Sequence, residues 1–249
     1  IRQQRRLREV NVTQTHELET ILRKVEKGPD VDALRGFEGS ATAAYFKTFR
    51  LALKGDWDFP AREYHPPTTE VNAILSLGYS LLYNNLFGAV NVVGLDPYMG
   101  YFHRPRHGHA ALVSDLQEEL RAAVVDRLVL TVLNNRQITK HDFLTDEQGR
   151  IKLQPAALKK FFAAYAAALN ESVYYPQQKI RTTYRQLIEL QVRQFARVLL
   201  GESEAYRPFD ADAAFNAGKP AVAGSLPKAP RNAQPGGADE SAPLADEDA

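Results

Sequence analysis

Hydrophobic residues along this chain recur mainly three and four positions apart, the spacing of one face of an amphipathic α-helix. Two short runs, 143–145 and 150–153, flank a turn and are typical of a small β-hairpin. We therefore predict a mainly α fold, a helical bundle around a long buried central helix. The expected helices lie within residues 1–28 and over 30–53, 69–94, about 110–133, 155–169 and about 176–200.

The central helix is expected over the most apolar stretch of the chain. Thr69 is suited to cap its start and Gly94 to end it. Because the helix is apolar on almost every side, it should form the core against which the others pack. Interrupting asparagines and serines make it too polar for a bilayer span. Three of its polar residues are either satisfied core groups or donors lining a site: Asn72, Tyr79 and Tyr83.

Composition restricts the chemistry more than it restricts the partner. The 249 residues are 44% hydrophobic and 24% charged, as in soluble globular proteins. Basic residues, 31 in number, nearly balance 30 acidic ones, but acidic residues predominate from Lys219 onward. The remaining chain is therefore positive, which mildly favours an anionic partner. The absence of cysteine excludes disulfides, thiolate zinc sites and a cysteine nucleophile, so any metal would need oxygen and imidazole ligands.

The two ends of the chain differ from its centre. Residues 1–29 begin with a basic patch that could meet phosphates, although a solvated helix face or a linker is favoured. No apolar run follows the patch, so no secretory signal is indicated and a cytoplasmic location is expected. Because the chain begins at Ile1, we expect it to be part of something longer. Residues 210–249, rich in Ala, Pro, Gly and Asp, predict a disordered tail. The expected domains are 1–29, a helical domain over 30–201 and a tail over 202–249.

One acidic residue, Glu38, falls on the apolar stripe of the second predicted helix. An unpaired buried carboxylate costs several kcal/mol, so this residue needs a cation, a proton or a position at the rim. Gly36 and Gly39 flank it and would permit close approach by a helix or a ligand backbone. A metal ligand and a rim glutamate paired with Arg35 or another arginine are equally good interpretations.

A second group of candidate ligands lies near the middle of the chain. His103 stands in a loop rich in proline and histidine, and the next helix carries Asp115, Glu118 and Glu119. The three- and four-residue spacing predicts that these acids share a side of the helix, where their charges repel. Imidazole and carboxylates together suit a divalent cation, but solvated acids, or a pairing with Arg121, are the commoner explanation.

The last predicted helix carries a row of arginines. They recur about every four residues along one edge, with Glu189 between them, at Arg181, Arg185, Arg193 and Arg197. Such an edge could contact a phosphate backbone, although ordinary ion pairs within the helix are the simpler interpretation.

Five segments together resemble one known family. They are LRGFEGSATAAYF, EVNAILSLGYSLLY, GLDPYMGYFH, SDLQEELRAAVVDR and QVRQFARVLLG. In order and spacing they are similar to the C-terminal helical domain of the CRISPR-associated integrase Cas1, over residues 30 to 201. The resemblance implies a Mg²⁺ or Mn²⁺ ion held by Glu38, His103 and Glu118, with Asp115 as an additional acid.

The resemblance also implies an activity and partners. Family members insert prespacer DNA into a CRISPR array by attack of a 3′-hydroxyl on a phosphodiester, together with the small partner Cas2. Arg104, Arg106 and His107 would then contact DNA beside the arginine row. The family dimerises through a β-rich domain that has no match in this sequence. A homodimer is therefore expected only of the full-length protein. A fused or associated reverse transcriptase is a further expectation. The alternatives are a general metal-dependent DNA nuclease and a non-catalytic scaffold of an adaptation complex.

Overall fold

The structure, a computed structural model, describes residues 12–28, 30–63 and 66–217. All of the elements below belong to one compact unit, Ile1–Gly218, and a second unit is formed by Lys219–Ala249. The basic patch within the first eleven residues lies outside the described residues. The predicted tail domain over 202–249 is described only as far as residue 217.

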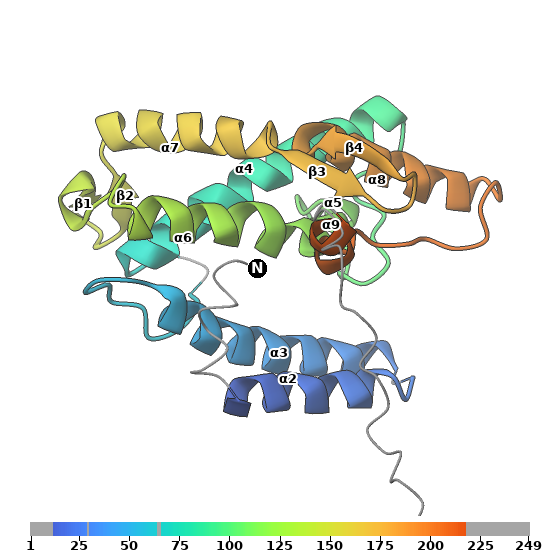
Figure 1. Ribbon diagram of the computed structural model, residues 1–249, viewed down its shortest axis with the longest axis horizontal. Coiled ribbons are helices and arrows are strands. Elements are labelled where there is room, and N and C mark those ends of the chain that lie inside the picture. Colours follow the sequence, from blue (N-terminus) through green and yellow to red (C-terminus); the bar gives the residue numbers. More distant parts are fainter. Residues whose placement is uncertain (1–11, 29, 64–65, 218–249) are drawn as a thin grey trace, which may run out of the picture. The chain divides into compact units, whose positions relative to one another are not determined.

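The described elements are mainly helical, as the sequence predicts (Figure 1). The helices are α2 (Val12–Val25), α3 (Val31–Ala52), α4 (Glu70–Val93), α5 (Ala111–Leu120), the π-helix η1 (Arg121–Asp126), α6 (Arg127–Asn134), the 3₁₀ turn η2 (Lys140–Asp142), α7 (Pro155–Leu169), α8 (Tyr184–Leu199) and α9 (Ala211–Ala217). The strands form two antiparallel pairs, β1 (Phe143–Thr145) with β2 (Ile151–Leu153) and β3 (Ser172–Tyr175) with β4 (Ile180–Thr183). Phe143 lies opposite Leu153, and Ser172 opposite Thr183.

The long helix α4 is the core helix that the hydrophobic pattern predicts. The Thr69 side chain accepts a hydrogen bond from the backbone N–H of Asn72, and Gly94 ends the helix at a φ of 89°. α4 packs against α5, η1, α6, α8 and β2. Among the described residues it alone is long and apolar enough to cross a membrane. Its fully buried side chains, such as Ile74 and Leu82, show that this apolarity forms the core of the unit.

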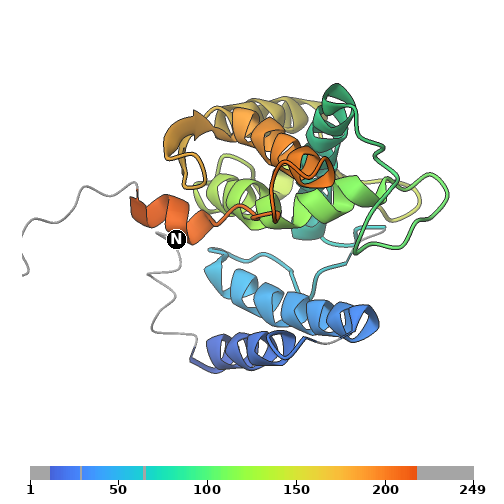
Figure 2. The same ribbon diagram turned by 90° about the vertical axis from the view of Figure 1, so that its right-hand side faces the viewer.

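Two helices at the start of the described chain form an antiparallel pair beside the core. Figures 1 and 2 show α2 and α3 side by side, and the two helices share many contacts. The side chain of Asp30 caps α3 by accepting a hydrogen bond from the N–H of Ala33 at 2.7 Å. The cap agrees with the predicted start of this helix.

The predicted helix over about 110–133 is not one continuous α-helix. Its middle turns, Arg121–Asp126, have the wider π-helical hydrogen bonding. Gly78 of α4 faces this segment, and a Cβ atom on it would lie 2.6 Å from the Val125 side chain. Only glycine therefore allows α4 and η1 to pack this closely.

The predicted helix over about 176–200 begins too early. Its first residues form the turn and strand β4 of the β3–β4 hairpin, and α8 starts at Tyr184, where Thr183 and Gln186 make a capping box. The β-branched pair Thr182 and Thr183 suits a strand, which the helical interpretation overlooked. Arg181 consequently lies on β4 and not on the arginine edge of the helix.

The short helix α9 is a further difference from the prediction. It lies inside the segment over 210–249 that was expected to be disordered. Phe209, just before it, and Ala214 within it are buried in the core. These two side chains give the segment an apolar anchor that its overall composition concealed.

Candidate metal centre

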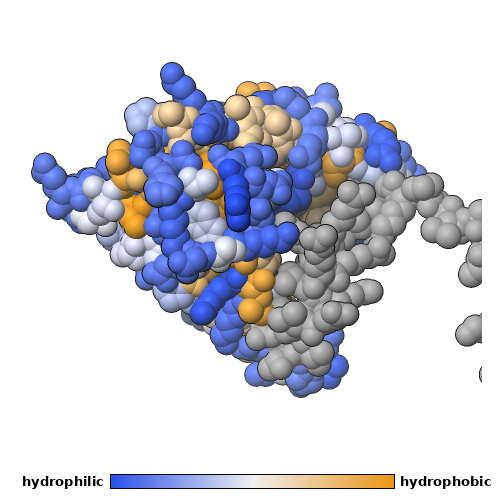
Figure 3. Space-filling view, turned by 60° about the vertical axis from the view of Figure 1, so that its left-hand side comes forward, coloured by the Kyte–Doolittle hydropathy of each residue, from blue (hydrophilic) through white to orange (hydrophobic). Residues whose placement is uncertain are grey.

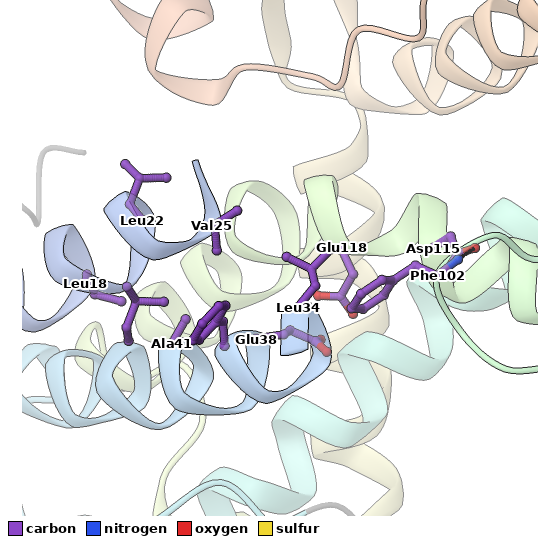
Figure 4. A pocket seen from close by; sticks show the side chains of 11 residues that line it. Leu18, Leu22, Val25, Leu34, Glu38, Ala41, Phe102, Asp115 and Glu118 are labelled. Atoms are coloured by element: carbon purple, nitrogen blue, oxygen red, sulfur yellow. Dashed lines mark hydrogen bonds between the residues drawn. The ribbon is translucent and has the colours of Figure 1, made fainter. Parts of the chain in front are cut away.

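Three residues far apart in the sequence meet at one place in the structure. Glu38 comes from α3, His103 from the loop between α4 and α5, and Glu118 from α5. One ligand atom of each lies within 4.8 Å of those of the other two. Figure 4 shows the Glu38 and Glu118 side chains approaching each other from the two helices. The predicted convergence of two carboxylates and an imidazole is therefore present.

Asp115 organises the loop that carries the histidine. Its carboxylate accepts hydrogen bonds from the backbone N–H groups of Tyr101, Phe102 and His103, at 2.6, 3.1 and 2.9 Å. The Nδ1 atom of the His103 ring lies 2.6 Å from the same carboxylate. Both carboxylate oxygens are thus engaged, and Nε2 of the ring remains for an ion. A carboxylate on the far nitrogen is a common partner of a metal-binding histidine. Asp115 therefore orients a candidate ligand, His103.

The same contacts set the charge of the pair. The hydrogen bond to Asp115 raises the pKa of His103, against the opposing effect of burial. Burial would raise the pKa of Asp115, but the His103 ring and the loop N–H groups together hold it below its ordinary value. The loop is therefore fastened by an ionised carboxylate.

A glycine lets the loop approach α5 this closely. A Cβ atom on Gly100 would lie 2.5 Å from the Cβ of Ala111 and 3.0 Å from a carboxylate oxygen of Asp115. Any larger residue would push the loop, and His103 with it, away from the helix that carries Glu118. By contrast, Cβ atoms built at Gly36 and Gly39 would meet nothing within 4 Å, so no other helix in the described part of the chain approaches them closely.

Arg35 joins the first helix of the site to the histidine loop. Its Nη2 and Nε atoms donate to the carbonyl oxygen of Phe102 at 2.5 and 3.2 Å. Its Nη1 atom donates to Asp32, which also accepts from Arg104 at 2.7 Å. The sequence suggested Arg35 only as a partner of Glu38. Its contacts with Phe102 were missed, because the position of the loop cannot be derived from helical spacing.

The charge around Glu38 favours a cation. The side chain is half-buried, and burial, followed by the nearby Glu118 carboxylate, raises its pKa. His103 and Arg121 oppose this rise. Glu38 is absent from the ion pairs found among the described residues, in which Arg35 contacts Asp32 instead. The pairing of Glu38 with Arg35 is therefore not present among the described residues, while a rim position agrees with its partial burial.

Glu118 has an arginine partner, as the alternative interpretation of the acidic turn proposed. The Nη1 atom of Arg121 donates to both Glu118 oxygens, at 2.8 and 2.9 Å. The guanidinium also lies over the Tyr79 ring, 4.5 Å from its centroid. An arginine and a second carboxylate thus both lie next to Glu118.

Glu119 does not share the face of Glu118, which corrects the prediction. Its carboxylate accepts hydrogen bonds from the Tyr206 hydroxyl, the Gln191 amide and the N–H of Phe209. Burial raises the pKa of Glu119, and these three donors oppose the rise. One step along a helix turns a side chain by about 100°. That step is enough to carry Glu119 to a different side of α5.

A cavity of about 600 Å³ opens beside the three candidate ligands. Figure 4 shows Leu18, Leu22 and Val25 of α2 on one side of it, with Glu38 and Glu118 on another. Apart from Asp115 and the two glutamates, its lining is apolar. The ligands therefore lie at an accessible position and not in a closed core.

The predicted DNA-binding residues are at the surface. Arg106 and His107 are exposed, while Arg104 contacts Asp32. On α8, Arg193 pairs with Glu189 within the helix, as the simpler interpretation proposed. Arg185 donates to Asn170, and Arg197 lies 3.6 Å from Glu202. Figure 3 shows one face of the molecule, mostly hydrophilic with small apolar patches. None of these contacts removes the arginines from solvent.

Similarity to known proteins identifies the family of this chain. The sequence profile described as "CRISPR associated protein Cas1" matches residues 1–167. This chain belongs to the Cas1 family. The CRISPR-associated endonuclease Cas1 of Leptospira interrogans is 36% identical over 188 residues, which are 74% of each chain. A Cas1 endonuclease of Thermus thermophilus is 40% identical over 192 residues.

The aligned part of the chain spans 58% of the Thermus protein and 35% of a Cas4–Cas1 fusion from Geobacter sulfurreducens. Solved structures of related chains have the same fold. A casposase bound to its integration product matches with a TM-score of 0.70 at 28% identity, over 75% of this chain and 55% of that one. A Cas6-RT-Cas1–Cas2 complex matches with a TM-score of 0.71 at 26% identity, over 83% of this chain and 22% of that one.

Proposed function

We propose that this chain forms the catalytic helical domain of a metal-dependent integrase of CRISPR adaptation. The observation that carries the proposal is the convergence of Glu38, His103 and Glu118 in a chain of the Cas1 family. The substrate would be prespacer DNA, and the reaction its insertion into a CRISPR array. The related casposase, solved with an integration product, supports strand transfer as the reaction type.

The residues present fit a hard divalent cation. Two carboxylates and one imidazole suit Mg²⁺ or Mn²⁺, and three protein ligands leave coordination positions for DNA oxygens. Asp115 holds Nδ1 of His103, so that Nε2 would be the ligand atom. When bound there, the ion would supply Lewis-acid stabilisation of the charge that develops on the phosphate.

The chemistry needs no covalent protein intermediate. A DNA 3′-hydroxyl attacks a phosphodiester of the repeat, one P–O bond forms and another breaks, and the departing 3′-oxygen takes up a proton. The role of the chain is to orient these groups: Arg35 and Asp115 keep the histidine loop against α3 and α5. Exposed Arg104, Arg106 and His107 would contact the DNA backbone next to His103.

Partners follow from the same proposal. A solved Cas6-RT-Cas1–Cas2 complex contains a chain similar to this one, which supports Cas2 as a partner and a reverse transcriptase as a further associate. The arginines of α8 and Arg181 on the β3–β4 hairpin would contribute contacts with DNA phosphates. The homodimer and the cytoplasmic location stay predictions.

The test replaces ligands and matched residues in parallel. Glu38→Ala and His103→Ala should each reduce strand transfer by at least about 100-fold, which corresponds to about 2.7 kcal/mol of transition-state stabilisation. Glu147→Ala and His141→Ala, exposed on the β1–β2 side, should leave it unchanged. The assay follows joining of a labelled DNA to a repeat-containing target, by purified protein supplied with Cas2. Undiminished joining by either ligand variant would refute the assignment.

Two other functions make different predictions. The relatives are described as endonucleases, which favours a nuclease that uses the same ligands with water as nucleophile. Such an enzyme would cut DNA with free 3′-hydroxyl ends and join none. The pairing of Arg121 with Glu118 favours a scaffold that binds no metal. A scaffold would take up no Mn²⁺ at this site and would keep its role when His103 is replaced.

A further inference from the structure

Arg121 is a cation built into the metal-binding face of α5. Its side chain is 14% exposed, and its Nη1 atom donates to both oxygens of Glu118. It stands at the junction of α5 with the π-helix η1. The proposed mechanism assigns no role to Arg121, although Arg121 contacts a candidate ligand, Glu118, directly.

The guanidinium is held by more than its ion pair. It lies over the ring of Tyr79, and the Tyr79 hydroxyl donates to buried Asp126. The backbone carbonyl of Tyr79 accepts a hydrogen bond from Gln117 at 2.7 Å. The ring beneath Arg121 is thus held by its hydroxyl group, and the backbone of the same residue is tied to α5. A guanidinium stacked on such a ring keeps its place when the carboxylate turns toward another cation.

A fixed positive charge at this position acts in two opposite ways. Its hydrogen bonds hold the Glu118 carboxylate in one orientation, beside Glu38 and His103. Its charge repels any divalent cation that Glu118 would also bind, and this repulsion is strong in a half-buried site. The two effects are separable, because one changes geometry and the other changes affinity.

We propose that Arg121 is a positioning residue that shares Glu118 with the metal ion, aligning the carboxylate while weakening metal binding. The proposal rests on the proposed function, since it concerns the same ion. Weaker binding would make loading of the ion depend on an additional anionic ligand, which the DNA phosphate provides. Removal of the Arg121 charge should therefore tighten metal binding and slow strand transfer.

The test measures both quantities on the same variants. In Arg121→Gln, calorimetric titration with MnCl₂ should show an affinity about tenfold higher than in the unmodified protein, while strand transfer falls about tenfold. Arg121→Lys keeps the charge and should bind Mn²⁺ with nearly unchanged affinity. Arg121→Met, which keeps apolar contact with the Tyr79 ring, replaces the glutamine variant if that variant does not fold.

Arg127→Gln is the matched control. Arg127 also lies over a tyrosine ring, that of Tyr184, and pairs with a glutamate, Glu171. Neither partner belongs to the metal-binding group, so this variant should change neither Mn²⁺ affinity nor strand transfer.

The outcomes separate this inference from the proposed function. If Glu118→Ala binds Mn²⁺ as well as the unmodified protein does, or if the unmodified protein binds none, the metal site itself is wrong and the inference falls with it. If Mn²⁺ binding requires Glu118 but is unchanged or weaker in the uncharged Arg121 variant, the metal site stands and the role of Arg121 is overturned.

Discussion

Two neighbouring glutamates on different faces of α5, Glu118 and Glu119, have contrasting surroundings. Glu118 lies among other titratable groups, next to Glu38 and His103, with Arg121 as its partner. Glu119 is surrounded by uncharged donors, a hydroxyl, an amide and a backbone N–H, contributed by α8 and the segment before α9. The first face concentrates negative charge at an accessible cavity, whereas the second surrounds a single half-buried carboxylate with donors to both of its oxygens.

The contrast shows what distinguishes a ligand from a structural acid. Burial alone does not, because burial raises the pKa of Glu38 and of Glu119 alike. Their partners differ. Neutral donors that bind both carboxylate oxygens offset the cost of burial without an ion, whereas a second carboxylate nearby costs free energy that a cation or a proton offsets.

Alanine substitutions at the two positions provide the largest expected contrast. Glu118→Ala should reduce strand transfer by at least about 100-fold. Its effect on the free energy of unfolding should stay within about 1 kcal/mol, because Glu118 is 39% exposed and its ion pair is partly solvated. Glu119→Ala removes the acceptor of three hydrogen bonds and should lower the free energy of unfolding by about 2–4 kcal/mol.

The measurement pairs urea unfolding with strand transfer at a temperature where both variants are folded. There, Glu119→Ala should retain activity within about tenfold of the unmodified protein, since it changes no candidate ligand and a tenfold loss is only about 1.4 kcal/mol. The distinction between the two faces is wrong if Glu118→Ala is less stable than Glu119→Ala, or if Glu119→Ala is less active than Glu118→Ala.

A smaller change examines the structural face alone. Tyr206→Phe removes the hydroxyl that donates to Glu119 but keeps the ring that packs on Phe195. Loss of one hydrogen bond to a buried carboxylate should lower the free energy of unfolding by about 1–2 kcal/mol. Tyr98→Phe, in an exposed loop position, should change it by less than about 0.5 kcal/mol. Equal stability of the two variants would show that the Tyr206 hydroxyl contributes nothing.

The sequence predicted the helices whose limits are marked by local signals. Asp30 and Thr69 cap α3 and α4, Pro155 begins α7, and Gly94 ends α4. Capping and helix termination are properties of a few consecutive residues, so they can be predicted without knowledge of the fold. The π-helical turns of η1 carry no such local signal, and the sequence did not reveal them.

The candidate site could be predicted only in part. Spacing placed Glu118 and Glu119 equally near Asp115, because three and four residues both return to one side of a helix. The packing of Tyr206 and Gln191, contributed from far along the chain, decides which glutamate is enclosed. The family resemblance selected Glu118, but the contacts of Arg35 with the histidine loop depend on tertiary structure that neither spacing nor motif describes.

Asp115 belongs to the ligand-bearing face of α5, but it binds no ion in our proposal. Asp115→Asn removes the charge that raises the pKa of His103, so that pKa should fall. The sign follows from linkage. The folded pKa of His103 lies above its unfolded value, so the pair stabilises the protein fully below the unfolded pKa and loses this contribution as pH rises through the folded one.

Imidazole resonances in an NMR titration without added metal give this pKa directly. Because an ion needs unprotonated Nε2, the pH at which Mn²⁺ binding is half-maximal should move downward in Asp115→Asn as well. Asp142→Asn is the matched control, since Asp142 also accepts a backbone N–H, from Thr139, but contacts no histidine ring of the site. An unchanged or higher His103 pKa in Asp115→Asn would contradict this role. Asp115 would then interact mainly with the loop N–H groups and not with the imidazole.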